Sequence, residues 1–379
     1  MSDRRASAAR LEDRLRDRRN NFDVLRLLAA SLVLFSHSYA LTGNIEPFAH
    51  VSGWTFGGIG VVMFFAMSGF LIAKSWSDHP QLVPFACKRA LRLLPALVVA
   101  VSVTVFVIGP LFTTLPLVSY FADPTTWVYL VRSSMLITFV GRLPGVFEDN
   151  PYPAAVNGSL WTLPVEACCY AMVAALGTLG LVRRSRLLVA VSCLLILCIT
   201  PLSPFSTASV GGTTGGNLTL LITLVATFVL GVTAYSLRGR LHLSWTIVAA
   251  LLVLWVVTWG GGWVRVSGVL AITFAVLVFA FRTPASLRRL TAPGDLSYGI
   301  YVYAFPVQQS LAALWGPGLD PLLMFAISFS VTYGLAFLSW RFVERPALAL
   351  KRVVAPRPPE QVEFGQSGRP AAKPLKALP

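Results

Sequence analysis

Long uninterrupted apolar stretches constrain the fold of this 379-residue chain more than any other feature. A stretch of about 17–25 apolar residues can cross a bilayer as an α-helix. Only 12% of the residues are charged, well below the fraction in soluble domains, so a water-soluble enzyme is excluded. We therefore predict an all-α, polytopic bundle of ten transmembrane helices. The ten stretches are residues 23–41, 55–73, 91–113, 159–182, 187–202, 217–236, 243–260, 266–281, 296–315 and 321–342.

A weaker apolar stretch at residues 125–141 contains Arg132 and several hydroxyl side chains. The positions of Lys and Arg decide whether it spans, because basic residues remain on the cytoplasmic side. Ten spans keep every basic cluster in the cytoplasm, with Arg265 a minor exception, whereas eleven would export the cluster at 183–186. We therefore predict an interfacial or re-entrant segment on the outer side. The connections without Lys or Arg are residues 42–54, 114–124, 203–216 and 316–320.

The same pattern predicts a multi-pass protein of the inner (cytoplasmic) cell membrane with both termini in the cytoplasm. Residues 1–20 are a polar cytoplasmic segment, 21–352 the membrane domain, and 353–379 a Pro-rich, basic cytoplasmic tail that we expect to be disordered. The net charge of +15 lies in short clusters between apolar runs, which excludes nucleic acid as a partner. The five cysteines show no metal-binding spacing, so neither a metal nor a bound cofactor is expected.

Ionisable side chains inside a bilayer are costly and therefore mark candidate functional sites. His37 lies in the first span, eleven residues after Arg26, on nearly the same helix face and about 16 Å further along the axis. Glu166 lies in the fourth strong span at the height estimated for His37, where it could orient the imidazole. The structural alternatives are a membrane-flanking arginine, a hydrogen-bonded core histidine and an acid paired with another group.

A basic cluster begins the third span in the segment PFACKRALRLLP. Arg89 and Arg92 are three residues apart and share a helix face, with Lys88 beside them. Such a cluster is often only a topological anchor. Together with Arg26, the guanidinium groups would also suit a phosphorylated cytoplasmic ligand through bidentate contacts.

Two further blocks are rich in small and aromatic residues. Ser68 and Gly69, in FFAMSGFLI, are expected to allow close helix packing. In LSYGIYVYAFPVQQ, we expect Tyr298, Tyr301 and Tyr303 to be anchors at the membrane interface rather than participants in chemistry.

In their order along the chain, these motifs resemble those of the integral-membrane acyltransferase family 3. Arg26–His37 is similar to the family's Arg-x10-His motif and Arg89–Arg92 to its Arg-x-x-Arg motif. FFAMSGFLI, SLWTLPVE, SYGIYVYAFP and FVERP resemble its later blocks. One departure is Ala304, where many members have a histidine, so no additional base is expected there.

The resemblance implies an enzyme that moves acyl groups, mostly acetyl, from cytoplasmic acyl-CoA to hydroxyls of extracytoplasmic or lipid-linked carbohydrates, such as O-antigen or exopolysaccharide. Acyl-CoA, as a co-substrate, would rest its phosphates on the basic residues, with its thioester near His37. His37 would be the general base and Glu166 its orienting partner; a covalent acyl-histidine is the variant mechanism. The alternative class is a transporter or flippase for a glycan or another solute, in which buried charges line a solute path.

The predicted topology is testable with reporter fusions. A fusion after Pro204 should report an outer location and a fusion after Leu241 a cytoplasmic one, because one span separates them. Two fusions reporting the same side would contradict the ten-span arrangement.

Overall fold

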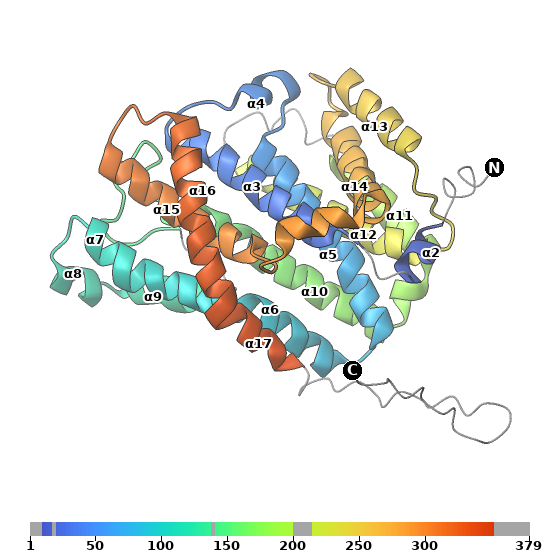
Figure 1. Cartoon of the computed structure of the whole chain (residues 1–379), viewed down its shortest axis with the longest axis horizontal. Helices are drawn as coiled ribbons and strands as arrows, with labels where there is room; N and C mark the ends of the chain where they lie inside the picture. Colours follow the sequence, from blue (N-terminus) through green and yellow to red (C-terminus); the bar gives the residue numbers. More distant parts are fainter. Residues whose placement is uncertain (1–9, 17–19, 138–140, 200–213, 352–379) are drawn as a thin grey trace, which may run out of the picture.

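The computed structural model describes residues 10–16, 20–137, 141–199 and 214–351, and within these ranges every extended regular element is a helix (Figure 1). The predicted all-α class is therefore confirmed. The helices are α2 (Leu11–Arg16), α3 (Phe22–Leu41), α4 (Pro47–Ser52), α5 (Phe56–Asp78), α6 (Leu82–Val103), α7 (Gly109–Phe112), α8 (Leu117–Ala122), α9 (Pro124–Ser134), α10 (Thr162–Thr178), α11 (Ser185–Ile199), α12 (Thr214–Ser236), α13 (Trp245–Val257), α14 (Val264–Arg282), α15 (Ser297–Trp315), α16 (Pro321–Ser339) and α17 (Arg345–Ala349).

Seven helices in the described ranges are long and apolar enough to cross a membrane, which makes the chain a multi-pass membrane protein. The prediction of ten spans exceeds this number because α11 and α13 have only 15 and 13 residues, and because α15 is less apolar. Within the segment predicted to be interfacial or re-entrant, residues 125–134 belong to α9, which has 11 residues. The ten-span count and the orientation of the termini stay predictions. The seven are Phe22–Leu41, Phe56–Asp78, Leu82–Phe112, Gly158–Thr178, Leu218–Ser236, Val264–Arg282 and Pro321–Ala349.

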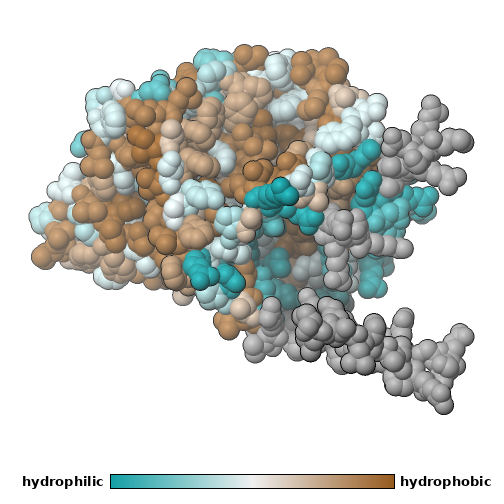
Figure 2. All heavy atoms as spheres, viewed as in Figure 1, coloured by the Kyte–Doolittle hydropathy of each residue, from teal (hydrophilic) through white to brown (hydrophobic). Residues whose placement is uncertain are grey.

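The surface of the bundle carries many large apolar side chains. Val107, Val257 and Phe342 are 50%, 75% and 72% exposed. In Figure 2 the visible face is mostly hydrophobic, and hydrophilic residues gather near the region where Figure 1 places α2 and the end of α5. This distribution is expected where lipid replaces water as the solvent around the helices.

Helix α15 is polar because protein rather than lipid surrounds it. Tyr298, Tyr301 and Tyr303 are only 7–8% exposed, so the prediction that they anchor the membrane interface is wrong. α15 packs against α3 and α16, and the hydroxyl of Tyr298 donates to the carbonyl of Leu93 on α6 at 2.7 Å. The hydroxyls of its three tyrosines find protein partners, which is the condition for burying them at low cost.

Helices α5 and α12 approach each other closely through glycines. A Cβ on Gly69 would lie 2.0 Å from the carbonyl oxygen of Phe228, and one on Gly231 would lie 2.4 Å from that of Ala66. The close packing expected at Gly69 is therefore present. It fixes α5 in the middle of the bundle, between α3 and α12 (Figure 1).

The described part of the N-terminal segment packs against the connection that follows α12. The amides of Leu11 and Glu12 donate to the carbonyls of Leu241 and Arg238 at 3.0 and 3.2 Å, and Leu11 is fully buried. The predicted tail, residues 353–379, lies outside the described residues, and its disorder stays a prediction.

The close approach at Gly69 predicts that even one added methyl group is destabilising. Gly69→Ala should lower stability by about 1–3 kcal/mol or more, because the Cβ must push two backbones apart. Gly334→Ala on α16 is the matched control, since its Cβ would meet nothing within 4 Å. Thermal unfolding of the purified proteins in detergent measures both, and equal midpoints would contradict the packing argument.

Candidate active site

A cavity of about 320 Å³ lies among α3, α5, α6, α10, α15, α17 and Lys351, which follows α17. Its wall carries four cations, two carboxylates, six hydroxyl side chains and nine apolar residues. Such a mixture suits a ligand with a charged end and a less polar arm. The polar lining residues are Arg26, Ser68, Arg89, Arg92, Thr162, Glu166, Tyr170, Asp295, Ser297, Tyr298, Tyr301 and Lys351.

The cations come from three distant parts of the sequence. Arg26 lies near the start of α3, Arg89 and Arg92 lie one turn apart on α6, and Lys351 follows α17. The sequence analysis does not identify Lys351, because basic residues after the last predicted span indicate only which side of the membrane is cytoplasmic. Lys88, a predicted binding residue, does not line the cavity, although its charge helps to lower the pKa of Lys351.

The pKa of Lys351 is lowered to about 8. Partial burial is the main cause, and the nearby positive charges of Arg89, Arg92, Arg26 and Lys88 add to it. Lys351 therefore changes charge close to physiological pH.

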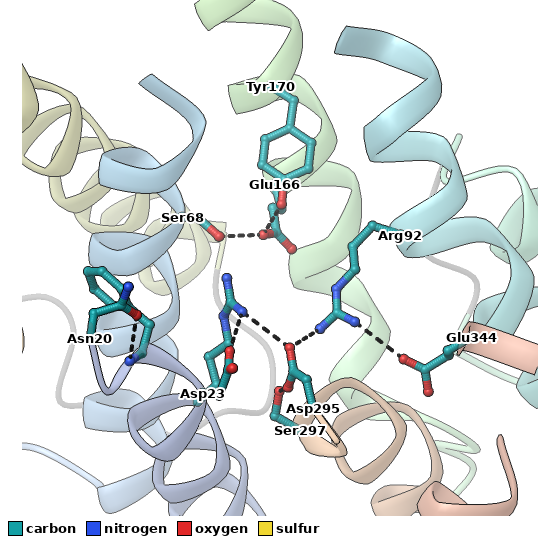
Figure 3. A network of polar contacts seen from close by, with 11 residues as sticks. Asn20, Asp23, Ser68, Arg92, Glu166, Tyr170, Asp295, Ser297 and Glu344 are labelled. Carbon is teal, nitrogen blue, oxygen red and sulfur yellow. Dashed lines mark hydrogen bonds and ion pairs between the residues drawn. The ribbon is translucent and has the colours of Figure 1, made fainter. Parts of the chain in front are cut away.

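One carboxylate, that of Asp295, joins two of the arginines (Figure 3). Its Oδ2 accepts from Nη2 of Arg92 at 2.6 Å and from Nη1 of Arg26 at 3.2 Å. Arg92 also reaches Glu344 at 3.5 Å, and Arg26 reaches Asp23 at 3.1 Å. The expected meeting of Arg26 with the Arg89–Arg92 face is thus present, but it depends on acids that the sequence analysis did not identify.

Local structure positions Asp295 and Glu344, the two acids that bind Arg92. Asp295 directly precedes α15, and the hydroxyl of Ser297 donates to its Oδ1 at 2.5 Å. Burial raises the pKa of the Asp295 carboxyl, but the neighbouring guanidinium groups outweigh that effect and hold it below its usual range. Glu344 is 2% exposed and ends the π-helical turn Trp340–Glu344 that joins α16 to α17. Such turns are rare and are frequent at functional sites.

Arg89 differs from the other two arginines in having no ion pair with a described residue. Its guanidinium carbon lies 5.9 Å from the centre of the Phe85 ring. Its Nε is buried and has no hydrogen-bond partner among the residues that the structure describes. A buried donor without a partner is costly, so Arg89 is the cation most ready to accept an anionic ligand.

Glu166 lies in the same cavity as the arginines. Its Oε1 accepts from the hydroxyl of Ser68 on α5 at 2.7 Å and from that of Tyr170, one turn along α10, at 2.5 Å (Figure 3). Ser68, expected to serve helix packing alone, therefore supplies a polar contact to the cavity. Tyr170 is a further cavity residue that sequence reasoning missed.

The cavity lining extends inward to a pair of hydroxyl groups. The oxygens of Thr162 on α10 and Tyr301 on α15 lie 2.6 Å apart. The Tyr301 hydroxyl is also 3.0 Å from the carbonyl oxygen of Ser159. These contacts tie α15 to the start of α10 beyond the charged part of the cavity.

His37 does not line this cavity. Its ring meets that of Phe305 edge-on, with centroids 5.1 Å apart, and its Nδ1 is buried without a hydrogen-bond partner in the described ranges. The predicted pairing of Glu166 with His37 is not among the hydrogen bonds of the described residues, because Glu166 faces the arginine side. One helix, α3, still connects the two regions through Arg26 and His37, about 16 Å apart along its axis.

Comparison with known proteins gives three partial matches. Over 153 residues, 40% of this chain, it is 39% identical to an O-acetyl transferase of Shigella phage Sf6. It is 34% identical over 160 residues to nodulation protein 10 of Rhizobium leguminosarum bv. viciae, and 39% identical over 90 residues to the putative membrane-bound transacylase BcsY of Komagataeibacter xylinus. The matches cover 44%, 42% and 20% of these relatives, which is less than half of each.

No solved structure matches the chain. A family model described as an acyltransferase domain matches residues 19–341, which include the cavity arginines, Glu166 and His37. The chain is a member of acyltransferase family 3, the integral-membrane acyltransferases.

Proposed function

We propose that this protein is a membrane O-acyltransferase that moves an acyl group from cytoplasmic acyl-CoA, with acetyl-CoA as the expected donor, to a hydroxyl of a cell-envelope or exported carbohydrate. The observation that carries the proposal is one cavity that gathers Arg26, Arg89, Arg92 and Lys351 at its charged end and continues inward to Tyr301. The partial likeness to an O-acetyl transferase supports the choice of acyl group.

The donor's phosphates would bind at the charged end. Arg89 and Lys351 are available there, whereas Arg26 and Arg92 already share the carboxylate of Asp295. Asp295 and Glu344 hold the two paired guanidinium groups in place while the site is empty, so that their forks need little ordering when phosphate arrives. Arginine suits this task because its planar fork binds phosphate through two donors.

The pantetheine arm would extend inward past Glu166. Both hydrogen bonds described for this carboxylate reach Oε1, so we assign Oε2 the amide N–H groups of pantetheine. This role replaces the orienting role that the sequence predicted for Glu166. An extended chain of this kind bridges the distance from the arginines to the level of His37, about 16 Å along α3.

His37 would act as the general base. Its imidazole takes the proton of the acceptor hydroxyl while that oxygen attacks the thioester carbonyl carbon. The carbon–sulfur bond then breaks, and the leaving thiolate of CoA receives the proton from the imidazolium. In the variant mechanism the unprotonated imidazole nitrogen attacks the thioester carbon first, and CoA leaves as the thiol with the proton of the other ring nitrogen. The acceptor oxygen then takes the acyl group from His37, and its hydroxyl proton returns to the imidazole.

Substitutions at the two ends of the site should fail in different ways. Arg92→Lys should weaken acyl-CoA binding by about ten- to a hundredfold, the worth of one charge-assisted phosphate contact at roughly 1.5–3 kcal/mol. His37→Ala should leave donor affinity intact and lower turnover by about a hundredfold or more. Donor affinity and transfer of labelled acetyl groups measure the two effects in purified protein.

Matched controls are Arg184→Lys and His79→Ala, since both side chains are exposed outside the cavity. Normal donor affinity in Arg92→Lys together with lost affinity in His37→Ala would contradict the proposal that the donor binds at the arginine end. Wild-type protein that neither binds nor consumes acyl-CoA with any glycan acceptor would favour the transporter class instead.

Lys351 predicts a pH dependence of donor binding. Its pKa of about 8 means that it loses its charge as the pH rises through 8, so an anionic donor that needs the charged form binds more weakly above that pH. From about pH 7 to pH 9 the affinity for a non-hydrolysable thioether analogue of acetyl-CoA should fall up to about tenfold. Lys351→Arg should bind the analogue well at both pH values, and Lys351→Met should bind it weakly at both. If the affinity of both variants still falls with pH as in the wild type, the assignment to Lys351 is contradicted.

A further inference from the structure

The lining of the donor cavity stops one helical turn short of His37. On α10 and α15 its innermost residues are Thr162 and Tyr301. Four residues further from the charged end lie Gly158 before α10 and Phe305 on α15. On α15 a spacing of four residues places Phe305 on the same side as Tyr301, one turn on, and Gly158, in the 3-10 turn Gly158–Trp161, meets the Phe305 ring. A second layer therefore lies directly beyond the cavity, and Phe305 occupies it.

The ring of Phe305 fills this layer. It meets His37 edge-on with ring centroids 5.1 Å apart, and it meets Tyr152 at 6.2 Å. A Cβ on Gly158 would lie 2.6–2.8 Å from two ring carbons, so no larger residue fits at 158 while the ring has this position. Phe305 is 4% exposed. The ring therefore stands between the inner end of the cavity and the imidazole.

The imidazole that meets this ring, and the residue after Gly158, each carry a buried polar atom without a described partner. Nδ1 of His37 and the hydroxyl of Ser159 are both buried without a hydrogen bond to any residue that the structure describes. An aromatic ring offers them neither a lone pair nor an N–H or O–H donor. Buried polar groups normally have partners, so an apolar ring against an unpartnered imidazole indicates a place that a polar ligand fills when the ring has turned away.

We propose that Phe305 is a specificity-determining residue whose ring closes the passage between the donor cavity and His37, and that its side chain sets how large an acyl group reaches the imidazole. The inference rests on the proposed function, because it takes the cavity as the donor site. While the ring is in place, neither thioester nor water passes from the cavity to His37. When it turns, the space that it leaves receives the acyl group.

The first test compares acyl groups of different length. Phe305→Ala and the milder Phe305→Leu should raise the ratio of butyryl to acetyl transfer at least tenfold, because one methylene in a fitted pocket alters selectivity by about ten- to two-hundredfold. Phe281→Ala is the matched control. Phe281 is a buried phenylalanine on α14, 6% exposed, that contacts Phe22 and Phe70 and does not line the cavity.

A purely structural role for Phe305 would lower transfer of both acyl groups, as Phe281→Ala should, and leave their ratio unchanged. An unchanged ratio in both Phe305 variants therefore overturns the proposal. The ratio does not depend on how much folded protein each preparation contains.

The second test needs no catalysis. In a chain whose five native cysteines have been replaced, His37→Cys is exposed to a small anionic methanethiosulfonate added from the cytoplasmic side of inside-out vesicles. Combining it with Phe305→Ala should speed modification of the new thiol at least tenfold, whereas combining it with Phe281→Ala should not. Equal rates in all three chains overturn the proposal. A faster rate, where the chain with His37 intact transfers no acyl group, upholds the passage and shows that the proposed function has failed.

Discussion

Two guanidinium groups share one carboxylate at the charged end of the bundle, and the rest of the cavity depends on this contact. Asp295 binds Arg92 and Arg26 at 2.6 and 3.2 Å and thereby connects α6, α3 and the start of α15. Charged groups inside a helix bundle are costly unless they are paired. The pairing fixes the three helices relative to one another, and the space enclosed between them is the proposed donor site.

The helix that follows this contact, α15, is unusually polar for a membrane protein because other helices enclose it. Asp295 lies two residues before its start, Tyr298 and Tyr301 line the cavity, and Phe305 follows Tyr301 by one turn. Protein surrounds the helix, and its hydroxyl groups bond to α6 and α10 instead of lipid. The stretch from Asp295 to Phe305 thus carries the carboxylate that binds two arginines, the inner end of the cavity and the residue next to His37.

The proposed function separates two tasks along α3. Binding is assigned to the end with Arg89 and Lys351, and proton transfer to the imidazole further along α3. Each region carries a buried polar atom without a described partner, Nε of Arg89 in one and Nδ1 of His37 in the other. Unpartnered buried groups reduce stability, and their presence at both ends supports the proposal that each end binds a substrate.

The sequence alone determined the membrane class and seven of the predicted spans, because the bilayer thickness sets the length of each apolar stretch. It also determined the shared face of Arg26 and His37 and the Arg89–Arg92 pair, because helix periodicity acts over short ranges of chain. Only the tertiary structure decided what those residues face. Asp295 lies 203 residues from Arg92, and Phe305 meets His37 across two helices, so no local pattern could reveal either contact. Likewise Tyr301 resembles an interface anchor until α15 is known to be enclosed by protein. Glu166 is expected at the depth of His37, yet it lies eight residues after Gly158, which meets Phe305 beside His37, and it contacts Ser68 and Tyr170 in the cavity. The position of a residue along its own helix follows from counting residues, whereas the depth at which two helices meet and the side that each residue faces follow from packing against neighbours that the local sequence does not specify.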